Sequence, residues 1–277
     1  MTNTTVIEQT KEGIYYREWQ IENPKAVILL VHGLGEHCQR YEPIVKELNE
    51  SGFIVSSMDL PHHGCSEGKK GHIPSFDIFE PVVLALTNKI KSDYPQLPVF
   101  ILGHSMGGLI TTLFISKYQD KFNGAILSGP AIDTPQKPPQ WQVATIKTIA
   151  KIIPSVGLIP IDASMVSRDP KVVKAYNEDP LVNSNKLTSK LLVELSNAMD
   201  EVKLKAHKIS LPILVMHGQA DQLTDPKSSE WLIDNISSKD KTLRLYEGLY
   251  HEIFNEPEAP QIYQEVIEWL DTQLEKT

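Results

Sequence analysis

Short apolar runs alternate with amphipathic stretches along most of the chain. Runs that are apolar almost without interruption predict strands covered by helices on both faces. They lie at Ala26–His32, Phe53–Asp59, Val99–Gly103, Gly124–Ser128 and Ile213–His217, with Leu243–Tyr246 as a weaker sixth. The stretches between them predict helices at Tyr41–Ser51, Ile78–Tyr94, Gly107–Tyr118, Ser228–Ile236 and Ala259–Leu274. This alternation indicates an α/β fold with a mostly parallel central sheet flanked by helices.

Two segments depart from this rhythm. Tyr15–Ile21 alternates apolar and polar residues, which predicts an antiparallel edge strand near the start. Residues 131–207 contain no buried-strand pattern and begin with a proline-rich run. We interpret 131–207 as a helical cap inserted between two strands, and 1–130 with 208–277 as the core. A cap in this place would cover the carboxyl ends of the strands, where α/β sheets bind their ligands.

The predicted cap contains an apolar helical pattern at Val143–Ile153 and a second helix at Ser189–Leu204. The apolar positions of the first helix form one stripe and are Ile146, Ile149, Ala150 and Ile153. Lys147 and Lys151 lie on the other side. Such a helix suits weak, reversible attachment to a membrane surface. The alternative is that both helices pack against the core.

Composition and charge exclude several classes of protein. The 277 residues are 41% hydrophobic and 22% charged, which is typical of a globular chain. A net charge of -8 without a dense basic run argues against binding to nucleic acid through phosphates. The first residues are polar and no apolar run is long enough to span a bilayer, so we expect a cytoplasmic protein. The two cysteines, Cys38 and Cys65, form no C-x-x-C pair and are expected to be reduced.

The strongest chemical motif is the run from Gly103 to Gly108, GHSMGG. It follows a predicted strand and precedes a predicted helix, which is the setting of a nucleophile elbow. Glycines fit the crowded flanking positions, and Ser105 is then presented as a nucleophile. The alternative is a glycine-rich turn with a helix-capping serine.

A serine nucleophile requires a histidine base oriented by a carboxylate, in the chain order Ser, Asp or Glu, His. The histidines after Ser105 are His207, His217 and His251. His251 lies in a loop between the last strand and the last helix and is the predicted base. His217 ends a strand and is expected to pack there.

Two aspartates compete for the role of the acid. Asp221 closely follows a predicted strand and is preferred. Asp225 precedes Pro226 and is expected to cap the next helix.

The developing oxyanion needs two backbone N–H groups. The predicted donors are Met106, directly after the nucleophile, and Leu34 in the glycine-containing loop after the first buried strand. The histidines of that loop and of the loop at His62-His63 lack the spacing of a metal site. No metal and no cofactor are therefore expected.

These residues resemble the monoacylglycerol lipases, a cap-bearing group of the α/β-hydrolase superfamily. The resemblance runs nearly from end to end. The similar segments include HGLGEHCQRY (32–41), DLPHHGCSEG (59–68), PIDASMVSRDP (160–170), YNEDPL (176–181) and HGQADQLTDP (217–226). The segments PIDASMVSRDP and YNEDPL lie in the predicted cap and are the most specific to this group.

The resemblance implies an α/β-hydrolase fold and a Ser105-Asp221-His251 triad that hydrolyses the ester of a monoacylglycerol or a similar single-chain lipid. It further implies that Glu36, Arg40 and Tyr176 line the polar end of the pocket, where the glyceryl group lies. The apolar cap would hold the acyl chain and contact the membrane.

Two other functions stay open. Mammalian members carry a second histidine where this chain has Phe254, so a lysophospholipase or general carboxylesterase is the runner-up. A binding protein without catalytic activity is a third reading, although all three triad residues are present.

Overall fold

The computed structural model describes residues 4–183 and 185–276, and its centre is a sheet of eight strands. The strands are β1 (Thr5–Lys11), β2 (Ile14–Gln20), β3 (Ala26–Val31), β4 (Phe53–Met58), β5 (Val99–His104), β6 (Gly124–Ser128), β9 (Ile213–Gly218) and β10 (Lys241–Tyr246). Their spatial order is β1-β2-β4-β3-β5-β6-β9-β10. β2 pairs antiparallel with β1 and β4, and all the other pairs are parallel.

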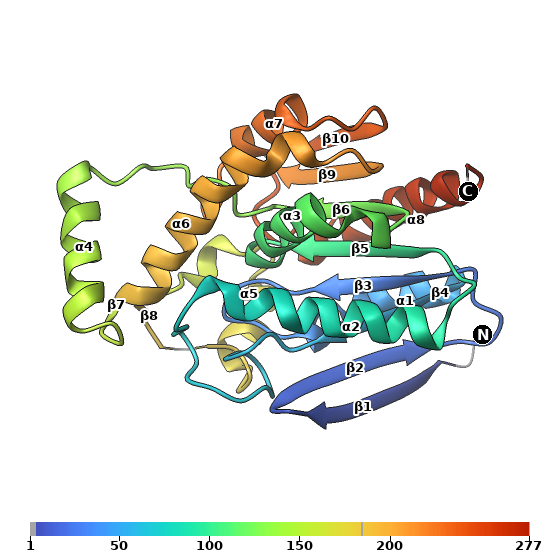
Figure 1. The fold of residues 1–277 in the computed structure, drawn as a ribbon, viewed down its shortest axis with the longest axis horizontal. Coiled ribbons are helices and arrows are strands. Elements are labelled where there is room, and N and C mark those ends of the chain that lie inside the picture. Colours follow the sequence, from blue (N-terminus) through green and yellow to red (C-terminus); the bar gives the residue numbers. More distant parts are fainter. Residues whose placement is uncertain (1–3, 184, 277) are drawn as a thin grey trace.

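Helices cover both faces of this sheet (Figure 1). They are α1 (Glu42–Glu50), α2 (Phe79–Asp93), α3 (Met106–Tyr118), α4 (Gln140–Ile152), α5 (Pro170–Glu178), α6 (Ser189–Lys205), α7 (Pro226–Asn235) and α8 (Ala259–Leu274). Alternate residues of a strand serve opposite layers. In β3, Ile28 and Leu30 belong to the core cluster that includes α1 and α8, whereas Val27 and Leu29 belong to the cluster on the other face, which includes α2, α3 and α7. The predicted α/β architecture with a mostly parallel sheet is confirmed.

The prediction of an edge strand at Tyr15–Ile21 is wrong in one respect. The strand exists as β2 and is antiparallel, but β1 lies outside it and forms the edge. Every residue of β1 is exposed, so no alternation of apolar and polar residues marks it in the sequence. At the other end of the sheet, the weaker run at Leu243–Tyr246 is confirmed as part of β10.

Residues 131–207 add no strand to the main sheet among the residues described. They contain α4, α5, α6 and a small antiparallel pair, β7 (Gly157–Ile159) with β8 (Leu187–Thr188). α6 packs against α3 and contributes Leu191, Leu195, Ala198 and Val202 to the main core. α4 packs against α6 and stands at the margin of the molecule (Figure 1). Within this segment, α6 thus belongs to the core and α4 lies outside it. We propose that residues 131–207 form the cap.

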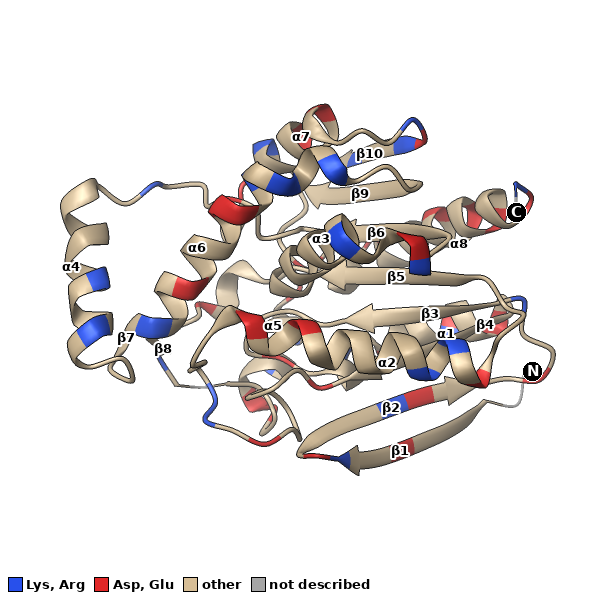
Figure 2. Cartoon of the chain, in the orientation of Figure 1, with Lys and Arg blue, Asp and Glu red and all other residues tan. Residues whose placement is uncertain are grey.

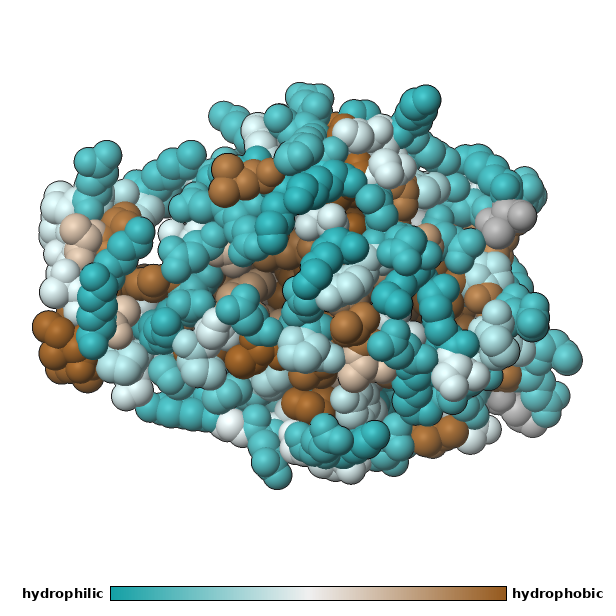
Figure 3. Space-filling model, in the orientation of Figure 1, coloured by the Kyte–Doolittle hydropathy of each residue, from teal (hydrophilic) through white to brown (hydrophobic). Residues whose placement is uncertain are grey.

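The predicted apolar stripe of the first cap helix does not all face one way. Ile146 and Ile149 are half-buried and Ala150 is buried on the side of α4 that packs against α6. Ile153 lies beyond the end of α4 and is exposed. The exposed apolar side chains of this region are instead Trp141, Ile152, Ile153 and Ile159. Figure 3 shows an apolar patch over the end of α4 that leads to β7.

Candidate active site

Ser105 lies in the turn between β5 and α3 and has a strained backbone, with φ 54° and ψ -120°. Glycines make the turn possible. A Cβ at Gly103 would lie 2.3 Å from Thr111 Oγ1, and one at Gly107 would lie 2.2 Å from the carbonyl oxygen of Val31. The backbone N–H of Ser105 donates to the carbonyl of Ser128 on the neighbouring strand β6 at 3.0 Å. The sequence motif therefore folds as the predicted strand-turn-helix elbow.

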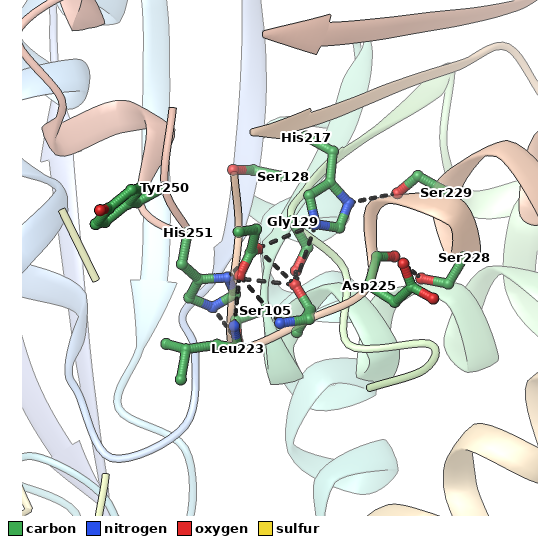
Figure 4. Close-up of polar contacts among 12 residues, drawn as sticks. Ser105, Ser128, Gly129, His217, Leu223, Asp225, Ser228, Ser229, Tyr250 and His251 are labelled. Carbon is green, nitrogen blue, oxygen red and sulfur yellow. Dashed lines mark hydrogen bonds and ion pairs between the residues drawn. The ribbon is translucent and has the colours of Figure 1, made fainter. Parts of the chain in front are cut away.

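The structure brings Ser105, His251 and Asp221 together at the carboxyl ends of β5, β10 and β9. Ser105 Oγ donates to His251 Nε2 at 2.8 Å (Figure 4), and His251 Nδ1 donates to Asp221 Oδ2 at 2.6 Å. The three residues are at most 9% exposed. This is the geometry of a nucleophile, a base and an orienting acid.

Asp221 is held by more groups than His251 alone. Its Oδ1 accepts the backbone N–H groups of Leu223 and Thr224 at 2.7 and 3.0 Å. Its Oδ2 also accepts hydrogen bonds from Thr224 Oγ1 at 2.7 Å and from His217 Nε2 at 3.0 Å. Burial raises the pKa of Asp221, but the charge of His251 and the hydrogen bonds from both histidines outweigh it and hold the pKa far below its ordinary value.

The charge of Asp221 acts on the base in return. Burial lowers the pKa of His251, but the negative charge of Asp221 and its hydrogen bond outweigh burial and raise the pKa above its ordinary value. His104, whose ring centre lies 4.8 Å from that of His251, behaves in the opposite way. Burial, and then the charge of His251, lower the pKa of His104 to about 4, so His104 is neutral at pH 7.

Asp225, the competing aspartate, does not contact His251. It is the N-cap of α7, where its side chain accepts the backbone N–H of Lys227 at 3.1 Å. In Figure 4 it faces Ser228, away from His251. The proline after Asp225 was the sequence signal for this capping role.

A cavity of about 390 Å³ opens above Ser105. Leu34 and Met106 line it, and neither backbone N–H donates to a protein acceptor among the residues described. The Met106 N–H is also the first of α3, where the helix dipole favours negative charge. The apolar lining comes chiefly from residues 159–199 and includes Ile161, Met165, Leu187, Leu192, Leu195 and Met199.

Of the three residues expected at the polar end of the pocket, Glu36 and Tyr176 line this cavity, whereas Arg40 is not part of its lining. Its guanidinium instead contacts three residues that do line the cavity: it binds the carboxylates of Glu36 at 2.6 Å and Glu252 at 2.7 Å, and lies 4.6 Å from the ring of Tyr176. Burial raises the pKa of Glu36, but the positive charge of Arg40 outweighs it and lowers the pKa to about 2. Glu252 lines the cavity as well and was not predicted from the sequence, and the same holds for the polar residues His104, Thr134, Asp162 and Thr224. The only sequence signal for Glu252 is its position next to His251.

The remaining histidines of the two loops bind protein groups. His37 Nε2 lies 2.9 Å from Asp179, His62 Nδ1 lies 3.2 Å from the carbonyl of Lys69, and His63 Nδ1 lies 2.9 Å from that of Pro61. Within residues 4–183 and 185–276, no group of three or more potential ligands is placed to hold a metal ion. Cys38 and Cys65 are free thiols.

The chain is similar to known proteins over most of its length. Residues 22–258 match a family model described as serine aminopeptidase, S33. A monoacylglycerol lipase of Mycolicibacterium smegmatis is 35% identical over 94% of this chain and 94% of its own length. A human monoglyceride lipase is 36% identical over 93% of this chain and 86% of its own length.

Solved structures point to the same group. The crystal structure of a monoacylglycerol lipase from Paleococcus ferrophilus superposes with a TM-score of 0.85 at 33% identity, covering 94% of this chain and 99% of that one. The chain therefore belongs to the monoacylglycerol lipase family of α/β-hydrolases and is a serine ester hydrolase of that family.

Proposed function

We propose that this protein hydrolyses the ester bond of monoacylglycerols and releases a free fatty acid and glycerol. Ser105 Oγ attacks the ester carbonyl while His251 Nε2 takes its proton, and the negative Asp221 stabilises the resulting imidazolium. The N–H groups of Leu34 and Met106 stabilise the oxyanion. His251 then returns the proton to the departing glyceryl oxygen. Water next attacks the acyl-enzyme, with His251 again as the base, and the fatty acid leaves.

The observation that carries this proposal is the composition of the cavity above Ser105. Its walls are apolar side chains, which suits one acyl chain, and it also contains Glu36, Tyr176 and Glu252, which suit the hydroxyls of a small polyol. A triacylglycerol would bring two further chains against these polar groups. Each polar group left without a partner would cost about 1–3 kcal/mol.

A lysophospholipase or general carboxylesterase is the second candidate, favoured by Phe254. This side chain is buried and its ring centre lies 6.2 Å from that of Tyr263, so it offers no hydrogen bond to a glyceryl hydroxyl. A lysophospholipid would also bring a phosphate near Glu36 and Glu252. Because one guanidinium, that of Arg40, pairs with both carboxylates in the part of the chain that the structure describes, we expect slow hydrolysis of lysophospholipids.

We further propose that the protein is cytoplasmic and contacts membranes peripherally through the cap. α4 carries Lys147 and Lys151 and no acidic residue (Figure 2), beside the exposed apolar side chains at its end. This combination suits a helix lying in a bilayer interface. No helix within the described part of the chain is long and apolar enough to cross a membrane.

The test is fatty-acid release from matched micelles of monoacylglycerol, diacylglycerol, triacylglycerol and lysophospholipid, with Ser105→Ala as the control. We expect monoacylglycerol to react fastest and Ser105→Ala to lose on the order of 10⁶ in kcat. Faster hydrolysis of lysophospholipid would establish the second candidate instead. Labelling by a fluorophosphonate separates both from a binding protein, which would remain unlabelled.

A further inference from the structure

His32 lies at the end of β3, directly before the loop that contains Leu34, and is fully buried. The backbone N–H of Leu60, just beyond the neighbouring strand β4, donates to its Nε2 at 2.8 Å. Because a backbone N–H can only donate, Nε2 must carry the lone pair and Nδ1 the proton. The other ring nitrogen, Nδ1, lies 2.8 Å from the carbonyl oxygen of Gly33 and therefore donates to it. The hydrogen bond from Leu60 thus fixes the tautomer of His32.

This tautomer fixes one peptide plane. The bond between Gly33 and Leu34 is trans, so its C=O and N–H point in opposite directions. With the Gly33 carbonyl held by His32, the Leu34 N–H must point to the other side of the peptide. Gly33 lies against the nucleophile, since a Cβ there would be 3.1 Å from Ser105 Cβ. The preceding peptide is held as well, because the Gly33 N–H donates to Glu36 Oε1 at 2.6 Å.

We propose that His32 is a positioning residue that aims the Leu34 N–H at the oxyanion formed on the substrate of Ser105. His32 acts through the Gly33 carbonyl and does not touch the substrate. The inference rests on the proposed function in that it requires a tetrahedral intermediate at Ser105. It does not depend on which ester is the natural substrate.

The buried ring is suited to this role because it stays neutral. Burial lowers the pKa of His32, so Nε2 remains free to accept from Leu60 at physiological pH. In a protonated ring Nε2 would itself carry a proton, so it would face the Leu60 N–H as a second donor and the hydrogen bond between them would be lost. The ring of the neighbouring His63, whose centre lies 5.5 Å away, bonds to the carbonyl of Pro61 and, among the residues described, makes no hydrogen bond to the Leu34 peptide.

Two substitutions distinguish the role of Nδ1 from the role of Nε2. In His32→Asn the amide N–H takes the position of Nδ1 and keeps the donor to Gly33, but loses the acceptor for Leu60. In His32→Gln the amide oxygen takes the position of Nε2 and keeps that acceptor, but loses the donor to Gly33. His63→Asn is the matched control, since it removes a neighbouring buried imidazole whose ring centre lies 5.5 Å from that of His32.

The measurement is kcat and KM on a soluble p-nitrophenyl ester, with thermal melting of each variant. We expect His32→Gln to lose about 10- to 100-fold in kcat with little change in KM, somewhat less than the loss of a whole oxyanion donor. His32→Asn and His63→Asn should keep kcat within about threefold while melting earlier than the unaltered enzyme. Equal loss of kcat in both His32 variants, or a loss that follows the melting temperature, would overturn the proposal.

A second measurement needs no variant. ¹⁵N NMR spectra of the unaltered enzyme with labelled histidine should show that His32 is protonated at Nδ1 and unprotonated at Nε2 at neutral pH. The opposite tautomer would also overturn the proposal. The Ser105→Ala variant keeps this inference separate from the proposed function. If Ser105→Ala is inactive and the two His32 variants do not differ, only the role of His32 falls. If Ser105→Ala remains active, both proposals fall.

Discussion

Arg40 and Glu252 form a two-pronged ion pair, in which Nη1 and Nη2 each lie 2.7 Å from a different carboxylate oxygen. The same guanidinium reaches Glu36 and covers the ring of Tyr176. One side chain thus joins the loop after β3, the loop of His251 and helix α5. Each of these segments lines the cavity above Ser105.

Replacing Arg40 with methionine should lower the free energy of unfolding by about 3 kcal/mol, because two carboxylates would be left buried without their cation. Urea denaturation with an unchanged m value is the measurement. Lys89→Met is the control, since Lys89 pairs with Asp93 on the exposed face of α2 and should cost about 0.5 kcal/mol or less. Equal losses in the two variants would contradict a structural role for the Arg40 cluster.

Asp221→Asn should reduce kcat on the order of 10⁴-fold while leaving the fold intact. The asparagine amide would disturb the tautomer of His251 and remove the charge that stabilises its protonated form. Steady-state kinetics on a soluble ester would measure the loss.

Asp225→Asn is the matched control for that variant, because asparagine is as good an N-cap as aspartate. We expect activity within about twofold of the unaltered enzyme and a stability change of only a few tenths of a kcal/mol. Greater impairment in Asp225→Asn than in Asp221→Asn would mean that the acid has been wrongly assigned.

The activity should fall on the acid side with a midpoint above pH 6.5. A base must be neutral to accept a proton, and the folded pKa of His251 is raised from its ordinary value of 6.5. Protonation therefore removes activity below that raised pKa. The measurement is kcat/KM against pH on an uncharged ester, which reports the free enzyme. Asp221→Asn should move the midpoint to lower pH, and a midpoint that does not move would contradict the coupling of the two residues.

Much of the fold follows from sequence because the buried strands carry strong local signals. β3 to β6 and β9 are covered on both faces, so their apolar runs stand out, and the elbow needs its glycines at fixed positions. β1 left no such signal because it is exposed on both faces. Asp221 was separable from Asp225 because Pro226 marks a helix start.

The contacts that sequence reasoning missed all depend on tertiary structure. His217 was expected simply to pack at the end of β9, yet it donates to the same oxygen of Asp221 as His251 does. Arg40 was expected in the pocket because of the family resemblance, but Glu252, which is 212 positions away, binds it. Neither partner can be inferred from local pattern, because each contact is set by where two separate loops meet.

The exposed apolar end of α4 should contribute to attachment to lipid. Ile152→Ser/Ile153→Ser should weaken attachment to lipid by about 1–2 kcal/mol, which is about 5- to 30-fold in activity at subsaturating micellar monoacylglycerol. Activity on a soluble short-chain ester should stay the same, because Ile152 and Ile153 are 73% and 56% exposed and do not line the cavity. Vesicle co-sedimentation would measure the attachment directly.

Two variants control for this result. Val6→Ser/Ile7→Ser removes a comparable exposed pair from β1, far from the cap in sequence, and should leave both activities unchanged. Ile149→Ser alters the side of α4 that packs against α6 and should lower stability, so its losses on the micellar and the soluble substrate should be similar. If Ile152→Ser/Ile153→Ser, like Ile149→Ser, lost similar activity on both substrates, the end of α4 would stabilise the fold by packing. The proposed membrane contact would then have to lie elsewhere.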